Sequence, residues 1–420
     1  MAKNANNSSA APGENARFEE LGRGCYAYSA DGCSNSGVVI GERGVLVVDG
    51  QASPDLAEKV LEKIREKTDK PIKLLVFSHF HCENTLGADA FEAGEIIASD
   101  LTRRMMDTRG KEEIRVARNR FPQLFSGVKH DAAVAAPSMT IASSMTIDLG
   151  GVEVRLMHLG RGHTMGDLVV WVPSTGVIFA GDLVQTSAAP FCGDAHLTDW
   201  PRALDRILAF RPNALMPGQG RSALGAPAVA AAIETTRDFV TTLRDAAVAC
   251  VDQHLGLKDT CDSVTDALAQ QFGDKTDFEE HMPFNVARAY DEALGLDQPQ
   301  VWTLERAADL QDAVRGVIAV SNEEEPASDD VNAQAQDARF QPDSGEADAF
   351  AQTDEATGDL VSDSAFAASL TGDEALDLTE QDIDREDQTA GEEAVSEDQQ
   401  DDPESDEGSD ERKVLEAARH

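Results

Sequence analysis

The sequence lacks any long run of apolar residues. No stretch of the 420 residues approaches the roughly 20 apolar residues that a membrane-spanning helix needs. The first 20 residues also contain no apolar segment between a basic start and a small-residue cleavage site, which is the pattern of a secretory signal. We therefore expect a cytoplasmic protein with neither a membrane span nor a secretory signal.

Cysteine is scarce and scattered. The chain has six cysteines, and no two of them have the C-x-x-C spacing. In a reducing compartment we expect them to be mostly free thiols. They are Cys25, Cys33, Cys82, Cys192, Cys250 and Cys261.

Basic residues are few compared with acidic ones. The chain has 36 Lys+Arg and 77 Asp+Glu, which gives a formal net charge of −41. Residues 321–420 hold 33 of the acidic and only 5 of the basic residues. A charge of this sign repels phosphate backbones and anionic lipids, so we expect neither nucleic acid nor a membrane surface as a partner.

The last hundred residues differ from the rest of the chain in composition as well. Residues 321–420 repeat Asp, Glu, Ser, Gln and Ala and contain too few large apolar residues to offset the entropy of ordering a backbone. We therefore predict a disordered acidic tail. Short apolar islands at Phe340, Phe350 and 366–370 are candidate binding spots for a protein partner, or they have no role.

Strand and helix patterns alternate from Cys25 onward. The runs 38–41 and 45–50 are typical of strands, and a helix capped by Ser53 with Pro54 in its first turn should follow. The run 72–78 is apolar almost throughout, as expected for a central strand buried on both faces.

The second half of the chain also alternates between strand and helix patterns. A hairpin around Gly150 and Gly151, a strand pair over 167–182, a helix over 199–210 and a strand over 213–218 are expected. Helical periodicity then dominates, over 227–251, 259–272 and 284–294. Two strand-rich halves backed by helices predict a layered α/β sandwich. The predicted domains are a flexible N-terminus (1–20), the sandwich domain (21–225), a helical C-terminal extension (226–320) and the acidic tail (321–420).

Candidate metal ligands stand at the ends of the predicted strands. His79 and His81 follow the strand 72–78, and two residues separated by one project the same way, so both can bind one ion. His163 lies in the glycine-flanked turn Gly-His-Thr-Met-Gly-Asp, and Asp182 ends another strand. Three histidines with an open position are a catalytic rather than a closed structural arrangement, and these ligands suit zinc, iron or manganese.

A single loop histidine is more often a surface or hydrogen-bonding residue than a ligand. What favours metal binding here is the order of the motifs, because GHTMGD, AGD and PGQG follow one another at successive strand ends. The remaining histidines we assign to structural or surface roles: His130, His158, His196, His254 and His281.

This ordered set resembles the metallo-β-lactamase-fold hydrolases over about residues 35–220. The family's first motif reads H-x-H-x-D-H, and later motifs centre on a His in G-H-T, an Asp at a strand end and a His in P-G-H-G. Within that superfamily, GRGHTMGDLVVWVP, AGDLV, PFCGDAH and PGQG resemble the branch called quinoprotein-relay-type zinc hydrolases. The resemblance implies a four-layer αβ/βα sandwich.

The resemblance also assigns roles to residues. His79, His81 and His163 match the first metal site, and Asp182 matches the bridging carboxylate. The second metal's ligands are altered, because Glu83, Asn84 and Gln219 stand where the pattern has Asp, His and His. Amide oxygens are poor substitutes for imidazole on zinc. We therefore expect one metal per chain, most simply Zn²⁺ with Fe or Mn as alternatives, and a weak or absent second site.

The altered carboxylate has a role of its own in this hypothesis. Glu83 is one methylene longer than the family's Asp, so it is expected to act as a general base on the metal-bound water, with Asp182 ligating or orienting that nucleophile. Asp49, which ends the strand 45–50, is expected to hold a histidine tautomer from outside the ligand shell.

Three functional hypotheses follow. The first is a hydrolase in which metal-bound hydroxide attacks the carbonyl of a small ester, thioester, lactone or lactam. The second is a catalytically degenerate binding or regulatory protein, and the third is a mononuclear iron oxygenase. The pocket for the small-molecule substrate is expected in the loops 101–145 and 185–198. Its candidate lining residues are Phe121, Phe191 and Trp200.

Overall fold

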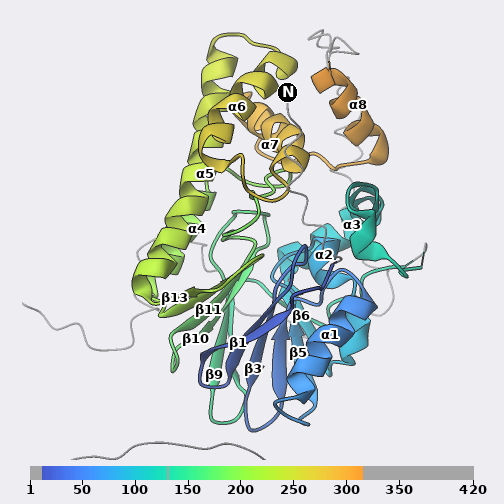
Figure 1. Ribbon diagram of the computed structural model, residues 1–420, viewed down its shortest axis with the longest axis vertical. Coiled ribbons are helices and arrows are strands. Elements are labelled where there is room, and N and C mark those ends of the chain that lie inside the picture. Colours follow the sequence, from blue (N-terminus) through green and yellow to red (C-terminus); the bar gives the residue numbers. More distant parts are fainter. Residues whose placement is uncertain (1–11, 130–131, 316–420) are drawn as a thin grey trace, which may run out of the picture. The chain divides into compact units, whose positions relative to one another are not determined.

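The computed structural model describes residues 12–129 and 132–315 (Figure 1). The predicted acidic tail with its apolar islands, His130 and the last five residues of the predicted helical extension lie outside the described residues. Among the described residues, no helix combines the length and the apolar character needed to cross a membrane. All six cysteines are buried and unpaired, as expected.

The first sheet has seven strands in sequence order. Strands β1 to β4 pair antiparallel, and β4 to β7 pair parallel. Its strands are β1 (Arg17–Gly22), β2 (Cys25–Ser29), β3 (Ser36–Ile40), β4 (Val45–Val48), β5 (Ile72–Val76), β6 (Glu95–Ser99) and β7 (Met139–Ile141). The parallel order requires crossover helices, which places α1 (Pro54–Arg65) and α3 (Asp100–Arg120) between strands.

The second sheet has six strands in the order β13-β12-β11-β10-β9-β8. Its strands are β8 (Ser144–Asp148), β9 (Glu153–His158), β10 (Leu168–Val172), β11 (Val177–Gly181), β12 (Ala214–Pro217) and β13 (Ala223–Leu224). The hairpin β8–β9 turns at Gly150 and Gly151, which both have a positive φ, as the sequence predicts. All five residues of β10 and of β11 are buried, because this sheet is covered on both faces.

Three apolar clusters show the layers. One packs α1 onto the outer face of the first sheet, a second fills the space between the two sheets, and a third packs α4 (Trp200–Ala209) onto the outer face of the second sheet. The order of the layers is therefore helix, sheet, sheet, helix (Figure 1). The predicted four-layer α/β sandwich is confirmed.

The C-terminal helices pack beside α4 and on one another. They are α5 (Ala226–Asp252), α6 (Leu257–Phe272), α7 (Phe278–Ala293) and α8 (Leu304–Arg315). Helix α5 follows the edge strand β13 and joins the same apolar cluster as α4, α6 and α7. Three of these helices were predicted, although α7 begins six residues before the predicted start and contains Pro283.

Two expectations about local structure were wrong. The segment 101–145, predicted as a loop, contains α3, a helix of 21 residues capped by Ser99, whose Oγ accepts a hydrogen bond from Thr102 N at 2.9 Å. Its sequence is rich in charges and interrupted by Gly110, so its apolar periodicity is weak. The N-terminal segment expected to be flexible up to residue 20 includes the start of β1 at Arg17.

Candidate metal centre

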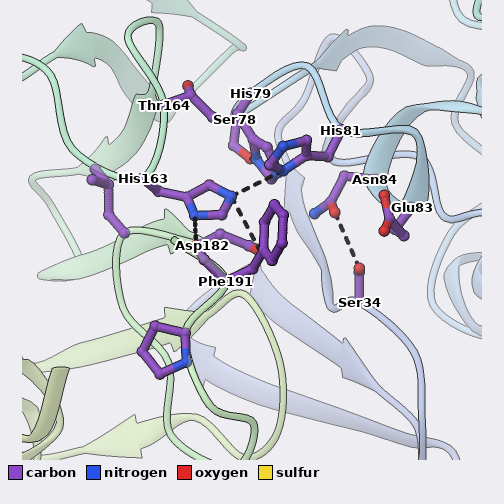
Figure 2. Close-up of polar contacts among 12 residues, drawn as sticks. Ser34, Ser78, His79, His81, Glu83, Asn84, His163, Thr164, Asp182 and Phe191 are labelled. Atoms are coloured by element: carbon purple, nitrogen blue, oxygen red, sulfur yellow. Dashed lines mark hydrogen bonds and ion pairs between the residues drawn. The ribbon is translucent and has the colours of Figure 1, made fainter. Parts of the chain in front are cut away.

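The site lies where loops from both sheets meet. His79 and His81 follow β5, and the short helix α2 (Cys82–Thr85) begins directly after His81. His163 lies in the loop between β9 and β10, and Asp182 follows β11. Figure 2 shows the side chains from these separate strand ends turned toward one another. The structure therefore brings together the three histidines that the sequence analysis assigned to one ion.

The three imidazole rings form a tight buried cluster. A nitrogen of each ring lies within 4.8 Å of the others, and the ring centroids are 4.8–4.9 Å apart. His163 Nε2 lies 3.0 Å from His81 Nδ1. In a tetrahedral zinc site the nitrogens of two histidines are about 3.3 Å apart. The distance between the His163 and His81 nitrogens is close to this value, and all three rings lie near enough to converge on a single ion.

Each ring is held by a partner on its far side. His79 Nδ1 bonds Ser78 Oγ at 2.9 Å, and His163 Nδ1 donates to the carbonyl oxygen of Phe191 at 2.9 Å. His81 Nε2 bonds Asp194 Oδ2 at 3.2 Å. These outer bonds leave His79 Nε2, His81 Nδ1 and His163 Nε2 facing inward, as ligand tautomers require.

The inward-facing atoms suit a metal ion. His79 Nε2 is buried and has no hydrogen-bond partner among the described residues, which is unfavourable unless something else binds it. Burial and the neighbouring imidazoles lower the pKa of His79 well below its usual range, and the same causes lower the pKa of His163. Both rings are therefore neutral and able to coordinate. The residues fit a metal ion bound by three histidines.

Asp182 brings a carboxylate to the inward-facing side of the cluster. Its Oδ2 lies 3.7 Å from His163 Nε2, and its Oδ1 is buried without a hydrogen-bond partner among the described residues. Burial raises the pKa of Asp182 to about 7. Gly218 lies so close to Oδ1 that a Cβ there would overlap it, so the turn after β12 leaves room for this carboxylate only because residue 218 is glycine.

Asp49 acts on the cluster through Ser78. Ser78 donates to Asp49 from its backbone nitrogen and from its hydroxyl, both at 2.8 Å, and this orientation makes Ser78 Oγ the acceptor for His79 Nδ1. Burial raises the pKa of Asp49 to about 6. Asp49 also has a positive φ of 64°, which is strained for a non-glycine residue. The Asp49 carboxylate therefore orients His79 indirectly, through the Ser78 hydroxyl.

Asn84 is engaged away from the cluster. Its amide nitrogen donates to Asp49 Oδ2 at 3.3 Å, and its amide oxygen accepts a hydrogen bond from Ser34 at 3.1 Å. In Figure 2 the Asn84 side chain extends toward Ser34 rather than into the histidine cluster. Both of its polar groups have protein partners, so Asn84 serves as a bridge between the loop after β2 and Asp49.

Glu83 does not join the histidine cluster either. The Glu83 carboxylate groups with Cys82 and Glu113, and Cys82 Sγ lies 3.6 Å from Glu83 Oε2. Figure 2 shows Glu83 on the far side of Asn84 from the imidazoles. Gln219 lines the cavity beside the cluster, and its backbone carbonyl oxygen accepts a hydrogen bond from the Thr186 hydroxyl at 3.1 Å.

The sequence analysis did not single out the partners of His81. Asp194 accepts hydrogen bonds from His81 and from Arg109, whose Nη1 lies 3.1 Å from Asp194 Oδ1. Glu113 also lies beside this pair, and burial raises its pKa to about 8. Burial lowers the pKa of His81, but the charges of Glu113, Asp194 and Glu83 outweigh it and raise that pKa to about 9. Arg109 and Glu113 come from α3, so a segment read as a loop offered no signal for them.

One face of α7 holds the loop 185–198 in place. His281 Nδ1 donates to Ala189 O, and Arg288 Nε donates to Ala195 O at 2.7 Å. The spacing of the residues that bond this loop follows the helical repeat, so they share one face. They are His281, Asn285, Arg288 and Glu292. This loop carries Phe191 and Asp194, so α7 positions partners of two metal-site histidines.

A cavity of about 660 Å³ opens beside the cluster. His81 and Asp182 lie in its wall, together with Phe121 and Phe191, as expected for these two aromatic residues. Trp200 does not line it, because its ring is fully buried and its Nε1 donates to Leu183 O at 3.0 Å. The metal site therefore has direct access to a space large enough for a small molecule.

Comparisons with known proteins find enzymes that are similar to parts of this chain. No known family profile matches the sequence. The chain is 24% identical over 244 residues to a linear primary-alkylsulfatase of Pseudomonas sp. (strain ATCC 19151), an alignment covering 50% of this chain and 46% of that enzyme. It is 30% identical over 103 residues to a metallo-β-lactamase type 2 of Bacteroides fragilis, covering 23% of this chain and 41% of that enzyme.

A solved metallo-β-lactamase from Pontibacter korlensis aligns with 54% of this chain and 99% of its own length, at 20% identity and a TM-score of 0.42. The chain spans less than half the length of the alkylsulfatase and of the Bacteroides enzyme. The chain is thus similar in sequence, over parts of its length, to metallo-β-lactamases and to an alkylsulfatase.

Proposed function

We propose that this protein is a metal-dependent hydrolase that acts on the carbonyl group of a small ester, thioester, lactone or lactam. The observation that carries the proposal is the buried convergence of three imidazole nitrogens, one of them without a partner, beside Asp182 and an open cavity. Three nitrogen ligands with an open position suit Zn²⁺, and Fe or Mn are alternatives.

The histidines and Asp182 have different roles in the proposed reaction. His79, His81 and His163 would hold the ion, which when bound acts as a Lewis acid and lowers the pKa of water to about 7. Asp182, beside His163, is placed to accept a proton from water or to orient it. The cavity opens beside the cluster, so a small molecule can reach the residues that would hold the ion.

Metal analysis combined with a hydrolysis panel tests the proposal. The purified full chain should contain close to one equivalent of zinc and should hydrolyse at least one of a generic ester, thioester, lactone or lactam. Replacing His79 and His81 with Ala should abolish both properties, and His254→Ala, which changes an exposed residue, should abolish neither. A protein without bound metal, or a metal-loaded protein inactive on the whole panel, would contradict the proposal.

The alternative is a binding or regulatory protein that has lost turnover. It is favoured by one observation, the commitment of the Asn84 amide to Asp49 and Ser34 where the family pattern has a metal-binding histidine. Stoichiometric metal in a chain that hydrolyses nothing on the panel would support it. Iron in place of zinc, in a chain that hydrolyses nothing on the panel, would support the oxygenase hypothesis instead.

Some finer assignments are also proposals. We infer membership of the quinoprotein-relay-type branch from the motif GRGHTMGDLVVWVP, with PFCGDAH and PGQG after it. The charge of −41 favours a protein that binds neither nucleic acid nor membranes. A cytoplasmic location and a protein partner for residues 321–420 are inferred from composition alone.

A further inference from the structure

We propose that Arg120 is the anchor for an anionic group on the substrate, so that the preferred substrate carries a carboxylate in addition to its reactive carbonyl. This inference rests on the proposed function, since it names the substrate class of the same cavity. Arg120 ends α3 and lines the cavity together with His81 and Asp182.

The guanidinium is enclosed by aromatic rings. Its Cζ lies 4.8 Å from the ring centroid of Phe121, 4.6 Å from that of Phe191 and 4.4 Å from that of Phe284. Ring faces attract a cation and hold it in one orientation, but they accept no strong hydrogen bond. Because Arg120 already lies over these three rings, their faces are not free to bind a cationic substrate.

The hydrogen-bonding capacity of this guanidinium is unused. Nε and Nη2 of Arg120 are buried and have no hydrogen-bond partner among the described residues. Buried donors of this kind are normally satisfied by protein, water or a ligand, and leaving them unsatisfied is unfavourable. Arginine presents a planar fork that matches a carboxylate with two parallel hydrogen bonds. A carboxylate from the substrate is the partner with this geometry.

Neighbouring acidic residues do not neutralise Arg120 by direct pairing. In the part of the chain that the structure describes, no carboxylate lies within ion-pair distance of this guanidinium. Burial lowers the pKa of Arg120, while the charges of Glu83, Glu113 and Glu280 oppose that effect and keep the cationic form favoured. The same carboxylates repel a second negative charge. The cavity therefore suits a substrate with a single anionic group.

The anchor and the histidine cluster share a wall. The Phe191 ring contacts Arg120 on one side and lies 5.6 Å from the His81 ring, centroid to centroid. The carbonyl oxygen of Phe191 also accepts the hydrogen bond from His163 Nδ1. A substrate whose carboxylate binds Arg120 can thus extend past Phe191 and present its carbonyl to the histidines.

A matched pair of esters tests this arrangement. We expect the wild type to show at least about tenfold higher kcat/KM for mono-4-nitrophenyl glutarate than for 4-nitrophenyl acetate, because a charged hydrogen-bonded pair contributes about that much. Arg120→Met should remove this preference by raising KM for the glutarate ester alone, and Arg120→Lys should retain part of it. Arg115→Met, on the exposed side of the same helix, should keep the wild-type preference. Equal rates for both esters in the wild type, or an equal loss on both in Arg120→Met, would overturn the inference.

A binding measurement separates this inference from the proposed activity. Calorimetric titration of glutarate, sulfate and phosphate onto the full chain should show binding of glutarate that Arg120→Met weakens at least about tenfold, with unchanged metal content and circular dichroism. Tighter binding of sulfate or phosphate than of glutarate would overturn the assignment to a carboxylate. Arg120-dependent glutarate binding without turnover of any ester would refute the hydrolase and retain the anchor. Ester turnover without Arg120-dependent glutarate binding would refute the anchor and retain the hydrolase. If Arg120→Met fails to fold, Arg120→Lys and Arg120→Gln provide the same comparison.

Discussion

Each histidine of the candidate metal centre is held by a partner from a different part of the chain. Ser78 and Asp49 hold His79, Asp194 holds His81, and the backbone of Phe191 holds His163. Such outer partners fix the tautomer and direction of a ligand and raise its basicity. The direction of each imidazole ring is thus fixed by its own hydrogen-bond partner before any ion binds.

The first prediction concerns metal content. Because the inward-facing nitrogens of three histidines form one ligand set and Asn84 is engaged elsewhere, we expect close to one equivalent of transition metal per chain. His79→Ala combined with His81→Ala should leave essentially none, as measured by mass spectrometry of the metals in purified protein. Two tightly held ions in the wild type would show that the one-metal interpretation is wrong.

The second prediction compares two carboxylates. Asp182 lies beside His163, whereas Glu83 lies beside Cys82 and Glu113. If the protein hydrolyses esters, Asp182→Asn should lower kcat by about 10² to 10⁴, the range for loss of a general base, with a smaller effect of Glu83→Gln. Metal content of both variants is measured in parallel. A collapse of turnover in Glu83→Gln with metal retained would instead support Glu83 as the base, as the sequence alone predicted.

At the level of elements, two helices complete the site, the crossover helix α3 and helix α7 of the C-terminal extension. Helix α3 supplies Arg109, Glu113 and Arg120, and one face of α7 bonds the backbone of the loop 185–198. A loop of this length has little order of its own. The rigid helices on either side of it therefore determine where Phe191 and Asp194 lie.

The third prediction tests the link between α3 and His81. Asp194→Ala removes the acceptor of both His81 and Arg109, so His81 loses the bond that directs Nδ1 into the cluster. We expect metal affinity to fall by about 10- to 100-fold, which is usual for loss of such a partner. Competition with a chelator measures it. An unchanged affinity would mean that packing alone orients His81.

The fourth prediction concerns stability. Arg288 is 1% exposed and donates to Ala195 O and to Glu292, among other acceptors. Arg288→Met leaves these buried acceptors unsatisfied and should lower the free energy of unfolding by about 3–5 kcal/mol. The matched control is Arg202→Met, which breaks an exposed ion pair with Asp199 and should change it by less than about 1 kcal/mol. Similar effects of the two changes in denaturant unfolding would contradict the role given to α7.

For the whole molecule, charge is distributed very unevenly. Residues 321–420 hold 33 of the 77 acidic residues, and the rest of the chain has a composition ordinary for a globular protein. Each of the layers and helices described above lies within residues 12–315. The candidate site therefore lies wholly within the described part of the chain.

The fifth prediction follows from this distribution. Deleting residues from 325 onward should leave the melting temperature and the metal content nearly unchanged, because a segment with so few apolar residues contributes little to a core. Differential scanning calorimetry and metal analysis of the shortened and full chains provide the comparison. A large fall in melting temperature would show that the acidic segment contributes to folding.

Local patterns in the sequence determined most of the sandwich. Period-two and fully apolar runs marked the strands, Gly150 and Gly151 marked a hairpin turn, and Ser53 with Pro54 marked the start of α1. These signals are local, because they depend on side-chain alternation and on backbone angles of single residues. The three histidines were found for the same reason, since each follows a recognisable strand end.

Only the tertiary structure decided what surrounds those histidines. Asp194 and Glu113 lie far from His81 in the chain and reach it through packing of the loop held by α7 and of α3. Arg120 lines the same cavity for the same reason. The position of Glu83 was decided in the same way, because the turn of α2 carries its carboxylate toward Glu113 rather than toward the imidazoles. A motif specifies which residue types stand at a strand end. The direction in which they point depends on neighbours that are distant in sequence, which no local pattern encodes.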